Sequence, residues 1–355
     1  MTSFGVEHEK DVILVEIRTS AGASGFGECV ASTAPLYSEE TNGTVWHVIR
    51  DFLAPQVLGT EIATPQDLLH VGDSFRAYKG NRMAKAAVEM AVWDAYARES
   101  GMPMHELLGG NRTEIEVGIS VGIQPSTEAL VKKVGGYLDQ GFRRIKVKVK
   151  PGVDLAPLRA LRGAFGDIPL MADANSAYTL QDLPHLQRLD EFGLMMIEQP
   201  LSHDDILHHA QLQAQLETPI CLDESIHSAA DAQKAIEAGA CKVINLKTGR
   251  VGGFAEALKI HEVCRQANLP LWCGGMLETG IGRLHNVAMT ALPGFTLPGD
   301  TAPSARYFEE DIINPPVEFI RPGYLPVDAV AGSASRLRLD LVDKWQVATE
   351  QVSNI

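Results

Sequence analysis

Short runs of apolar, largely β-branched residues recur at a nearly fixed interval through the middle of the chain. Successive runs start about 25 residues apart, with helix-like segments between them. The runs span residues 115–123, 145–149, 169–172, 194–197, 219–222, 242–246, 270–273 and 295–297. Strands that alternate with helices in this way form parallel βαβ units. Eight such units predict a closed (β/α)8-type TIM barrel, and their even spacing favours closure over an open, doubly wound sheet.

The residues before and after these runs have a different pattern. Residues 12–19 alternate like a half-buried strand, residues 20–27 resemble a turn-rich hairpin connection, and residues 44–53 and 82–99 have helical patterns. An α+β domain is therefore expected to precede the barrel. The predicted division is an α+β domain over 1–112, the barrel over 113–314, and a C-terminal segment over 315–355 that returns to the first domain.

Composition and charge exclude several classes of protein. No apolar run reaches the length of about 18 residues that a membrane span needs, and the first residues lack the pattern of a signal peptide. The five cysteines are scattered without a CxxC pair, which favours a reducing cytoplasm over a disulfide framework or a zinc site. The net charge is −14 with no basic stripe, so nucleic acid is not an expected partner.

Three carboxylates occupy equivalent positions in consecutive βα units. Asp173, Glu198 and Asp223 each follow a predicted strand, at intervals of 25 residues. Because catalytic groups of such barrels lie at the C-terminal ends of strands, these side chains should converge. Acids held together cannot all stay ionised without a cation, and oxygen ligands favour Mg²⁺, with Mn²⁺ or another divalent ion as the alternative. Gln199 and Glu224 are placed to support the ligands from a second layer.

Lysines flank these acids on both sides. Lys146 and Lys148 alternate along one strand and so face the same, inward side, whereas Lys247 lies one unit beyond Asp223, across the barrel mouth. A substrate held by the metal would lie between Lys148 and Lys247. A lysine in such a place should have a lowered pKa and act as a general base. The set predicts removal of a proton α to a carboxylate, with a metal-stabilised enolate.

Each of these signals has an ordinary structural explanation when taken alone. A single acid at a strand end is often structural, and Lys-x-Lys on a strand most often marks a solvated face. The conjunction of three acids and two lysine positions at one-unit spacing is what favours a catalytic site.

Motifs of one known enzyme group are distributed along the whole sequence. They lie at residues 2–5, 27–30, 35–37, 81–85, 118–122, 144–148, 173–175, 197–200, 221–225, 245–247, 273–278 and 297–301. On these motifs the chain resembles the enolase superfamily, muconate-lactonizing subgroup. Within that subgroup it is similar to the o-succinylbenzoate synthase / N-acylamino acid racemase family.

The resemblance implies an architecture and a set of roles. The first domain would cap the barrel mouth, and we expect this capping domain to be N-terminally truncated, because family members usually begin with a strand before segment 2–5. Lys148 and Lys247 would be the paired acid/base lysines, with Lys146 supporting Lys148. Arg250 matches a position associated with racemase-capable members. The residues implied to line the substrate pocket are Phe4, Tyr37, Ser120, Asn175, Gly275, Met276 and Leu277.

Two reactions share a site of this kind. The synthase removes the α-proton of 2-succinyl-6-hydroxy-2,4-cyclohexadiene-1-carboxylate and eliminates water, giving the o-succinylbenzoate of menaquinone synthesis. The racemase removes the α-proton of an N-succinyl or N-acyl amino acid with one lysine and returns a proton from the other. We expect a cytoplasmic, homo-oligomeric Mg²⁺ enzyme that acts on a small-molecule carboxylate and catalyses both reactions.

Alternatives to this expectation stay open at the level of sequence. The main one is a dedicated N-acylamino acid racemase, ahead of a dipeptide epimerase or a cycloisomerase. A non-catalytic structural or binding barrel is the alternative from another class of protein.

Overall fold

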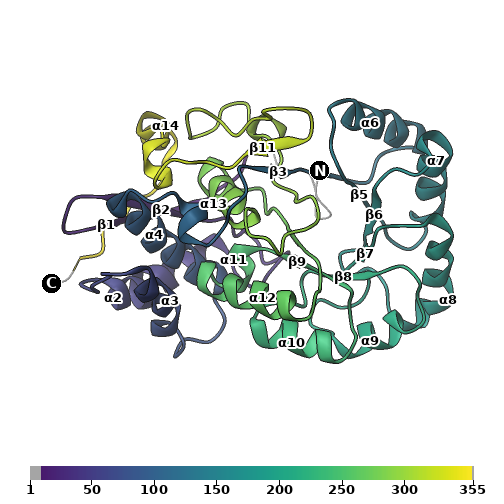
Figure 1. The fold of residues 1–355 in the computed structure, drawn as a ribbon, viewed down its shortest axis with the longest axis horizontal. Coiled ribbons are helices and arrows are strands. Elements are labelled where there is room, and N and C mark those ends of the chain that lie inside the picture. Colours follow the sequence, from purple (N-terminus) through teal and green to yellow (C-terminus); the bar gives the residue numbers. More distant parts are fainter. Residues whose placement is uncertain (1–8, 354–355) are drawn as a thin grey trace.

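A curled sheet of seven parallel strands forms the centre of the molecule, in a computed structural model that describes residues 9–353 (Figure 1). The strands are adjacent in the order β10-β9-β8-β7-β6-β5-β4. Their bounds are β4 Ile119–Val121, β5 Ile145–Lys148, β6 Leu170–Asp173, β7 Ile197–Glu198, β8 Ile220–Leu222, β9 Val243–Leu246 and β10 Leu271–Cys273. The prediction of a curled parallel barrel is thus confirmed, with differences at its first and last strands.

The eighth predicted strand, over 295–297, is present only as isolated bridges. Phe295 forms a parallel bridge with Leu271 of β10, and Gly299 forms one with Val117, beside β4. This segment closes the ring between the two edges of the sheet. It does not form a continuous ladder because prolines flank it on both sides, and a proline has no N–H to donate.

The first predicted run, over 115–123, is divided into two short strands. Its beginning forms β3 (Glu114–Glu116), which pairs antiparallel with β11 (Tyr324–Pro326) in a separate sheet. Its second part is β4 of the barrel. Gly118 lies at the division, packed against the guanidinium of Arg144, which lies within 3 Å of where a Cβ would be.

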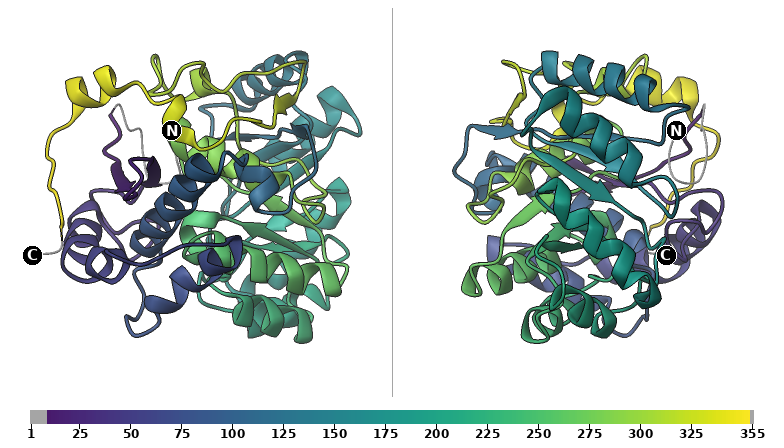
Figure 2. Two further views of the ribbon diagram at one scale, coloured as in Figure 1. Left: turned by 60° about the vertical axis from the view of Figure 1, so that its left-hand side comes forward. Right: turned by 90° about the vertical axis from the view of Figure 1, so that its right-hand side faces the viewer.

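Helices cover the outside of the barrel (Figures 1 and 2). The helix-like segments expected between the apolar runs are confirmed, for example as α6, α10 and α12. The bounds of the helices in this part are α6 Thr127–Asp139, α7 Leu155–Phe165, η2 Leu180–Asp182, α8 Leu183–Leu186, η3 Gln187–Phe192, α9 Leu207–Gln213, α10 Ala229–Glu237, α11 Thr248–Val251, α12 Phe254–Gln266 and α13 Gly280–Thr290. The barrel interior holds its own apolar cluster, made by Met171, Met196, Cys221, Val243 and Trp272.

The capping domain is built on a hairpin that packs on one long helix. Its elements are β1 Ile13–Arg18, β2 Ser24–Cys29, α1 Asn42–Val48, η1 Ile49–Leu53, α2 Ala54–Val57, α3 Pro65–Ser74, α4 Arg82–Ser100 and α5 Met104–Leu107. The predicted connection over 20–27 is too long, because β2 already begins at Ser24. Gly25 and Gly27 belong to that strand, and they allow α4 to approach closely: a Cβ on Gly27 would lie 1.9 Å from the carbonyl oxygen of Ala87.

The C-terminal segment returns to the capping domain (Figure 2). Its elements are β11, η5 Ser333–Ser335 and α14 Leu339–Trp345; the short helix η4 Ser304–Arg306 precedes it. Ser333 donates two hydrogen bonds to Asp94 of α4, and the indole of Trp46 on α1 donates one to Glu350. None of the helices within residues 9–353 is long and apolar enough to cross a membrane.

Candidate active site

Three charged side chains lie side by side at the carboxyl ends of β5, β6 and β7. Lys148 pairs in register with Asp173, and Asp173 pairs in register with Glu198. The register follows from the regular repeat, since βα units of similar length bring equivalent strand positions to the same height in a barrel. The Nζ atom of Lys148 lies 2.6 Å from Oδ2 of Asp173 and also donates to Oδ1 of Asn175. Both carboxylates are buried.

Asp223 and Lys247 continue this arrangement on the next two strands. Each lies one residue beyond its strand, β8 or β9. The Nζ atom of Lys247 lies 2.8 Å from Oδ2 of Asp223, and Arg250 donates to the other carboxylate oxygen. Lys247 also donates a hydrogen bond of 2.9 Å to the hydroxyl of Tyr37. A residue of the capping domain therefore touches a predicted base of the barrel.

Lys146 extends into the barrel from the same side of β5 as Lys148. Its ammonium group lies 2.7 Å from Asp300, 3.1 Å from Glu198 and 3.3 Å from Asp173. Burial by itself would lower the pKa of Lys146, but these three carboxylates together raise its pKa well above the usual value. The surrounding carboxylates therefore favour the charged form of Lys146 in this structure.

The pKa of Lys247 is raised in this structure, whereas the lowered pKa was predicted for a lysine beside a bound metal. Burial acts to lower the pKa of Lys247, yet the charge of Asp223 and the contact with Tyr37 raise it above its usual value. The carboxylate 2.8 Å away stabilises the charged form of the lysine more than burial destabilises it. Lys247 can lose its proton easily only when Asp223 is engaged elsewhere.

The chemistry of the buried acids fits a hard divalent cation. Burial and the negative charge of Asp173 raise the pKa of Glu198 to about 8. Within the described residues, Oε2 of Glu224 is buried and accepts no hydrogen bond. The other oxygen of Glu224 accepts a hydrogen bond of 3.0 Å from the side chain of Asn175. These acids offer only oxygen atoms as metal ligands, and part of their negative charge is not balanced by hydrogen bonds or ion pairs. Mg²⁺ prefers ligands of this kind.

The acids do not form a ready-made ligand cluster in the structure. Among residues 9–353, no group of three or more His, Cys, Asp or Glu side chains is arranged to hold a metal ion. The physical reason is that the ammonium groups of Lys146, Lys148 and Lys247 lie against the carboxylate oxygens and take up their charge. The metal assignment of the three acids accordingly stays a prediction.

The residues implied to contact substrate line one continuous hollow, of about 3070 Å³. Four residues of the lysine and carboxylate set line it as well: Lys146, Lys148, Asp173 and Lys247. The six pocket residues that the structure describes, and that line this hollow, are Tyr37, Ser120, Asn175, Gly275, Met276 and Leu277. The seventh, Phe4, lies outside the described residues.

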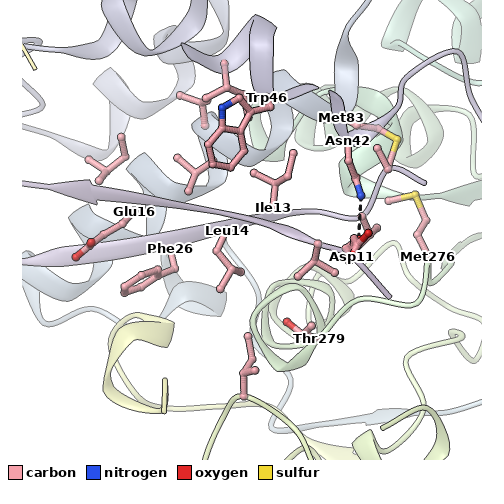
Figure 3. Close-up of a pocket in the computed structure, with 18 of the residues that line it drawn as sticks. Asp11, Ile13, Leu14, Glu16, Phe26, Asn42, Trp46, Met83, Met276 and Thr279 are labelled. Carbon is pink, nitrogen blue, oxygen red and sulfur yellow. Dashed lines mark hydrogen bonds between the residues drawn. The ribbon is translucent and has the colours of Figure 1, made fainter. Parts of the chain in front are cut away.

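This hollow is shared between the barrel and the capping domain. Figure 3 shows Met276 and Thr279 of the barrel on its wall together with Ile13, Leu14 and Trp46 of the cap. Most of the residues that line it belong to the capping domain and to the C-terminal segment, and the lysines and acids are a small part of its lining. We therefore locate the candidate site by its chemistry, at the barrel mouth.

Two residues that contact the site were assigned no role from the sequence, although both lie in the motifs at 245–247 and 297–301. Asp300 contacts Lys146, and Asn245 donates a hydrogen bond of 2.7 Å to Oε1 of Glu198. Asn245 could have been found, because it lies two residues before Lys247 on β9 and so faces the same side of the strand. Asp300 lies in the motif at 297–301, but strand periodicity could not place its side chain, because it follows the irregular segment that closes the barrel.

The fold and the site together define a class of protein: a barrel enzyme with a capping domain and an acid–base site at the barrel mouth. Residues 129–349 match the family described as "Enolase C-terminal domain-like", and residues 1–109 match "Mandelate racemase / muconate lactonizing enzyme, N-terminal domain". The chain belongs to the enolase superfamily, in its mandelate racemase / muconate lactonizing group.

Relatives within this superfamily include two enzymes with different names. The chain is 55% identical over 317 residues to the o-succinylbenzoate synthase of Geobacillus stearothermophilus, covering 89% of this chain and 84% of that protein. It is 46% identical over 348 residues to the N-succinylamino acid racemase of Thermus thermophilus, covering 97% and 93%. A solved enolase superfamily structure from Listeria innocua is similar with a TM-score of 0.94 and 42% identity, covering 99% of this chain and 93% of that one.

Proposed function

We propose that this enzyme is a Mg²⁺-dependent o-succinylbenzoate synthase that also racemises N-succinyl and other N-acyl amino acids. One observation carries the proposal: Lys148 and Lys247 lie at the carboxyl ends of β5 and β9, and β6, β7 and β8 lie between these strands in the sheet. In a curled barrel this separation puts the two lysines on opposite sides of the mouth. The names of the two relatives described above agree with the two reactions proposed.

The proposed chemistry begins with the removal of a proton α to a carboxylate. One of the two lysines takes the proton and leaves an enolate. In the synthase reaction the ring hydroxyl then takes a proton from the lysine that removed the α-proton and departs as water, and the ring becomes aromatic. In racemisation the second lysine donates a proton to the opposite face of the same carbon, so this reaction needs a working lysine on each side.

Asp173, Glu198 and Asp223 are the proposed ligands of the metal. Mg²⁺ bound there would supply positive charge that stabilises the enolate. For Mg²⁺ to bind, Lys146, Lys148 and Lys247 must release the carboxylate oxygens that they contact in this structure. Metal binding would therefore also favour the neutral form of Lys247, which can act as a base. Glu224 and Gln199 support the ligands; Oε1 of Gln199 accepts a hydrogen bond of 3.0 Å from the backbone of Asp223.

The pocket for the rest of the substrate is assigned to the residues that line the hollow at the barrel mouth. Ser120 and Asn175 belong to the barrel wall, whereas Met276 and Leu277 belong to the loop after β10. Leu277 has a positive φ of 65°, a conformation that costs energy in a residue with a side chain and is typical of functional loops. Tyr37 would close the pocket from the cap.

Assays of both reactions on one preparation test the proposal. We expect o-succinylbenzoate formation and N-succinyl amino acid racemisation, both lost when Mg²⁺ is chelated. Racemisation without synthase activity would support the runner-up, a dedicated N-acylamino acid racemase. Absence of both activities with Mg²⁺ present would overturn the proposal and favour a non-catalytic barrel.

We also propose a reducing, cytoplasmic setting for the enzyme. All five cysteines are buried and free, which agrees with a reducing cytoplasm. A small carboxylate substrate agrees with the lysines at the barrel mouth. We also keep as proposals the division into segments 1–112, 113–314 and 315–355, and assembly as a homo-oligomer.

A further inference from the structure

Lys146 lies where it competes with a metal ion. Its Nζ atom is 3.1 Å from Glu198 and 3.3 Å from Asp173, which are two of the three proposed ligands. An ammonium group on these oxygens blocks the positions that a divalent cation needs, and two cations that share them repel each other. The side chain is almost fully buried, so it cannot withdraw into solvent. A metal site here needs another partner for Lys146.

Asp300 is placed to be that partner. Its Oδ2 atom lies 2.7 Å from Nζ of Lys146, closer than either proposed ligand. Asp300 comes from the segment that closes the barrel, on the other side of β4 from β5. A lysine that turns toward Asp300 therefore turns away from Asp173 on β6 and Glu198 on β7.

Asp300 is itself held firmly. Its backbone N–H donates a hydrogen bond of 2.8 Å to the carbonyl oxygen of Cys273, and its Oδ1 atom accepts one of 2.5 Å from Arg144. Arg144 is fully buried, donates 2.9 Å to the carbonyl oxygen of Pro298, and lies 4.2 Å over the ring of Trp272. With one oxygen fixed by Arg144, the other is directed at Lys146.

We propose that Asp300 is a positioning residue that holds the ammonium of Lys146 beside the metal ligands and so frees the oxygens of Glu198 and Asp173 for the ion. This inference rests on the proposed metal site and adds a residue to which no role has been assigned. The simpler alternative is that Asp300 only neutralises Arg144, in which case its loss would act equally whether or not Lys146 is present.

A double-mutant cycle separates these two roles. Mg²⁺ alone is titrated calorimetrically into the full chain as wild type, Asp300→Asn, Lys146→Met and the double variant. The amide has one acceptor oxygen for two donors and no charge, so it cannot hold both Lys146 and Arg144. We expect Asp300→Asn to weaken Mg²⁺ binding on the order of 10- to 100-fold, as is usual for a residue that supports ligands. In the Lys146→Met variant, Asp300→Asn should weaken Mg²⁺ binding by less than about threefold.

A matched control comes from the capping domain. Asp94 is also a buried carboxylate with several hydrogen bonds, from Phe26 and Ser333. Asp94→Asn should leave the Mg²⁺ affinity unchanged. The inference would be overturned if Asp300→Asn weakened Mg²⁺ binding equally with and without Lys146, or did not weaken it at all. The proposed metal site would not be affected by either result. Failure of the wild type to bind Mg²⁺ would instead overturn the metal site, and the inference with it.

Crystal structures of the wild type keep the inference testable if a variant does not fold. With Mg²⁺ bound, we expect the contact between Lys146 and Asp300 to persist and the contact between Lys146 and Glu198 to lengthen. A Lys146 that remains on Glu198 and leaves Asp300 would overturn the proposal.

Discussion

The hydroxyl of Tyr37, on the capping domain, accepts a 2.9 Å hydrogen bond from Lys247 at the end of β9. The same ammonium lies 4.7 Å from the centre of the tyrosine ring. The side chain of the cap therefore fixes the direction in which a base of the barrel points. A site assembled from two domains in this way is complete only when the cap is in place.

Replacing Tyr37 by Phe tests this contact. The ring remains and the hydroxyl is lost, so kcat for racemisation should fall about tenfold, the equivalent of one hydrogen bond to a charged group. KM should change less, because the contact is made to the base. Tyr324→Phe is the control, since that hydroxyl binds Glu116 outside the site. Equal kcat values for wild type and Tyr37→Phe would show that Lys247 needs no such support.

Two buried glutamates of the cap make its contact with the barrel sensitive to pH. Glu89 accepts hydrogen bonds from the backbone of Phe254 and Ala255, at the start of α12, and burial raises its pKa to about 7. Glu28 binds the start of α13 through Thr279, and burial raises its pKa to about 7 as well. Because these values lie above the usual value near 4.5, the folded protein holds more protons than the unfolded chain between pH 4.5 and 7.

The variant Glu89→Gln isolates one of these contributions. The stability that the raised pKa gives is fully present below pH 4.5 and is lost as pH rises through 7. Relative to wild type, the glutamine variant should therefore gain up to about 3 kcal/mol in free energy of unfolding between pH 4.5 and 8. Denaturant unfolding at several pH values measures the difference. A difference that is constant with pH would show that Glu89 has an ordinary pKa.

Because β2 and α4 approach closely, we expect the addition of one methyl group between them to reduce the stability of the protein strongly. In Gly27→Ala the new Cβ would lie 1.9 Å from the carbonyl oxygen of Ala87 and 2.8 Å from the backbone nitrogen of Ala91, so the backbone of α4 leaves no room for it. We expect a loss of more than about 3 kcal/mol in stability, or failure to fold. Gly163→Ala is the control, because nothing lies within 4 Å of its added Cβ, and it should stabilise α7 by up to about 1 kcal/mol. Similar stabilities of the two variants would contradict the packing described here.

The regular repeat explains how much of the site the sequence could predict. Asp173 and Glu198 lie in register because each is one βα unit from its neighbour, and periodicity alone specifies that. Periodicity does not predict the contact of Lys146 with Asp300, because Asp300 follows the irregular segment that closes the barrel. The run at 295–297 matched the repeat, but the prolines beside it prevented an eighth continuous strand, so the repeat did not predict where Asp300 lies. The hydrogen bond from Lys247 to Tyr37 joins two domains, which no local pattern encodes.

Mg²⁺ should stabilise the folded protein through the three proposed ligands. At a Mg²⁺ concentration 100 times the Kd, the gain is about 2.7 kcal/mol, seen as a higher Tm. Glu198→Gln should lose this gain, since an amide is a poor ligand for a hard ion. Glu262→Gln, on the exposed face of α12, should keep it. A Tm that rises equally with Mg²⁺ in Glu198→Gln and wild type would place the ion elsewhere.

Exchange of the α-proton with solvent deuterium tests the central claim, that Lys148 and Lys247 act as bases on opposite faces of one carbon. The exchange is followed by NMR on both enantiomers of an N-succinyl amino acid with Mg²⁺ present. The wild type should exchange both enantiomers. Lys148→Ala and Lys247→Ala should each lose racemisation and slow exchange of one enantiomer by roughly 10²- to 10⁴-fold, a different enantiomer for each variant. Exchange of both enantiomers at the wild-type rate in either variant would contradict the account.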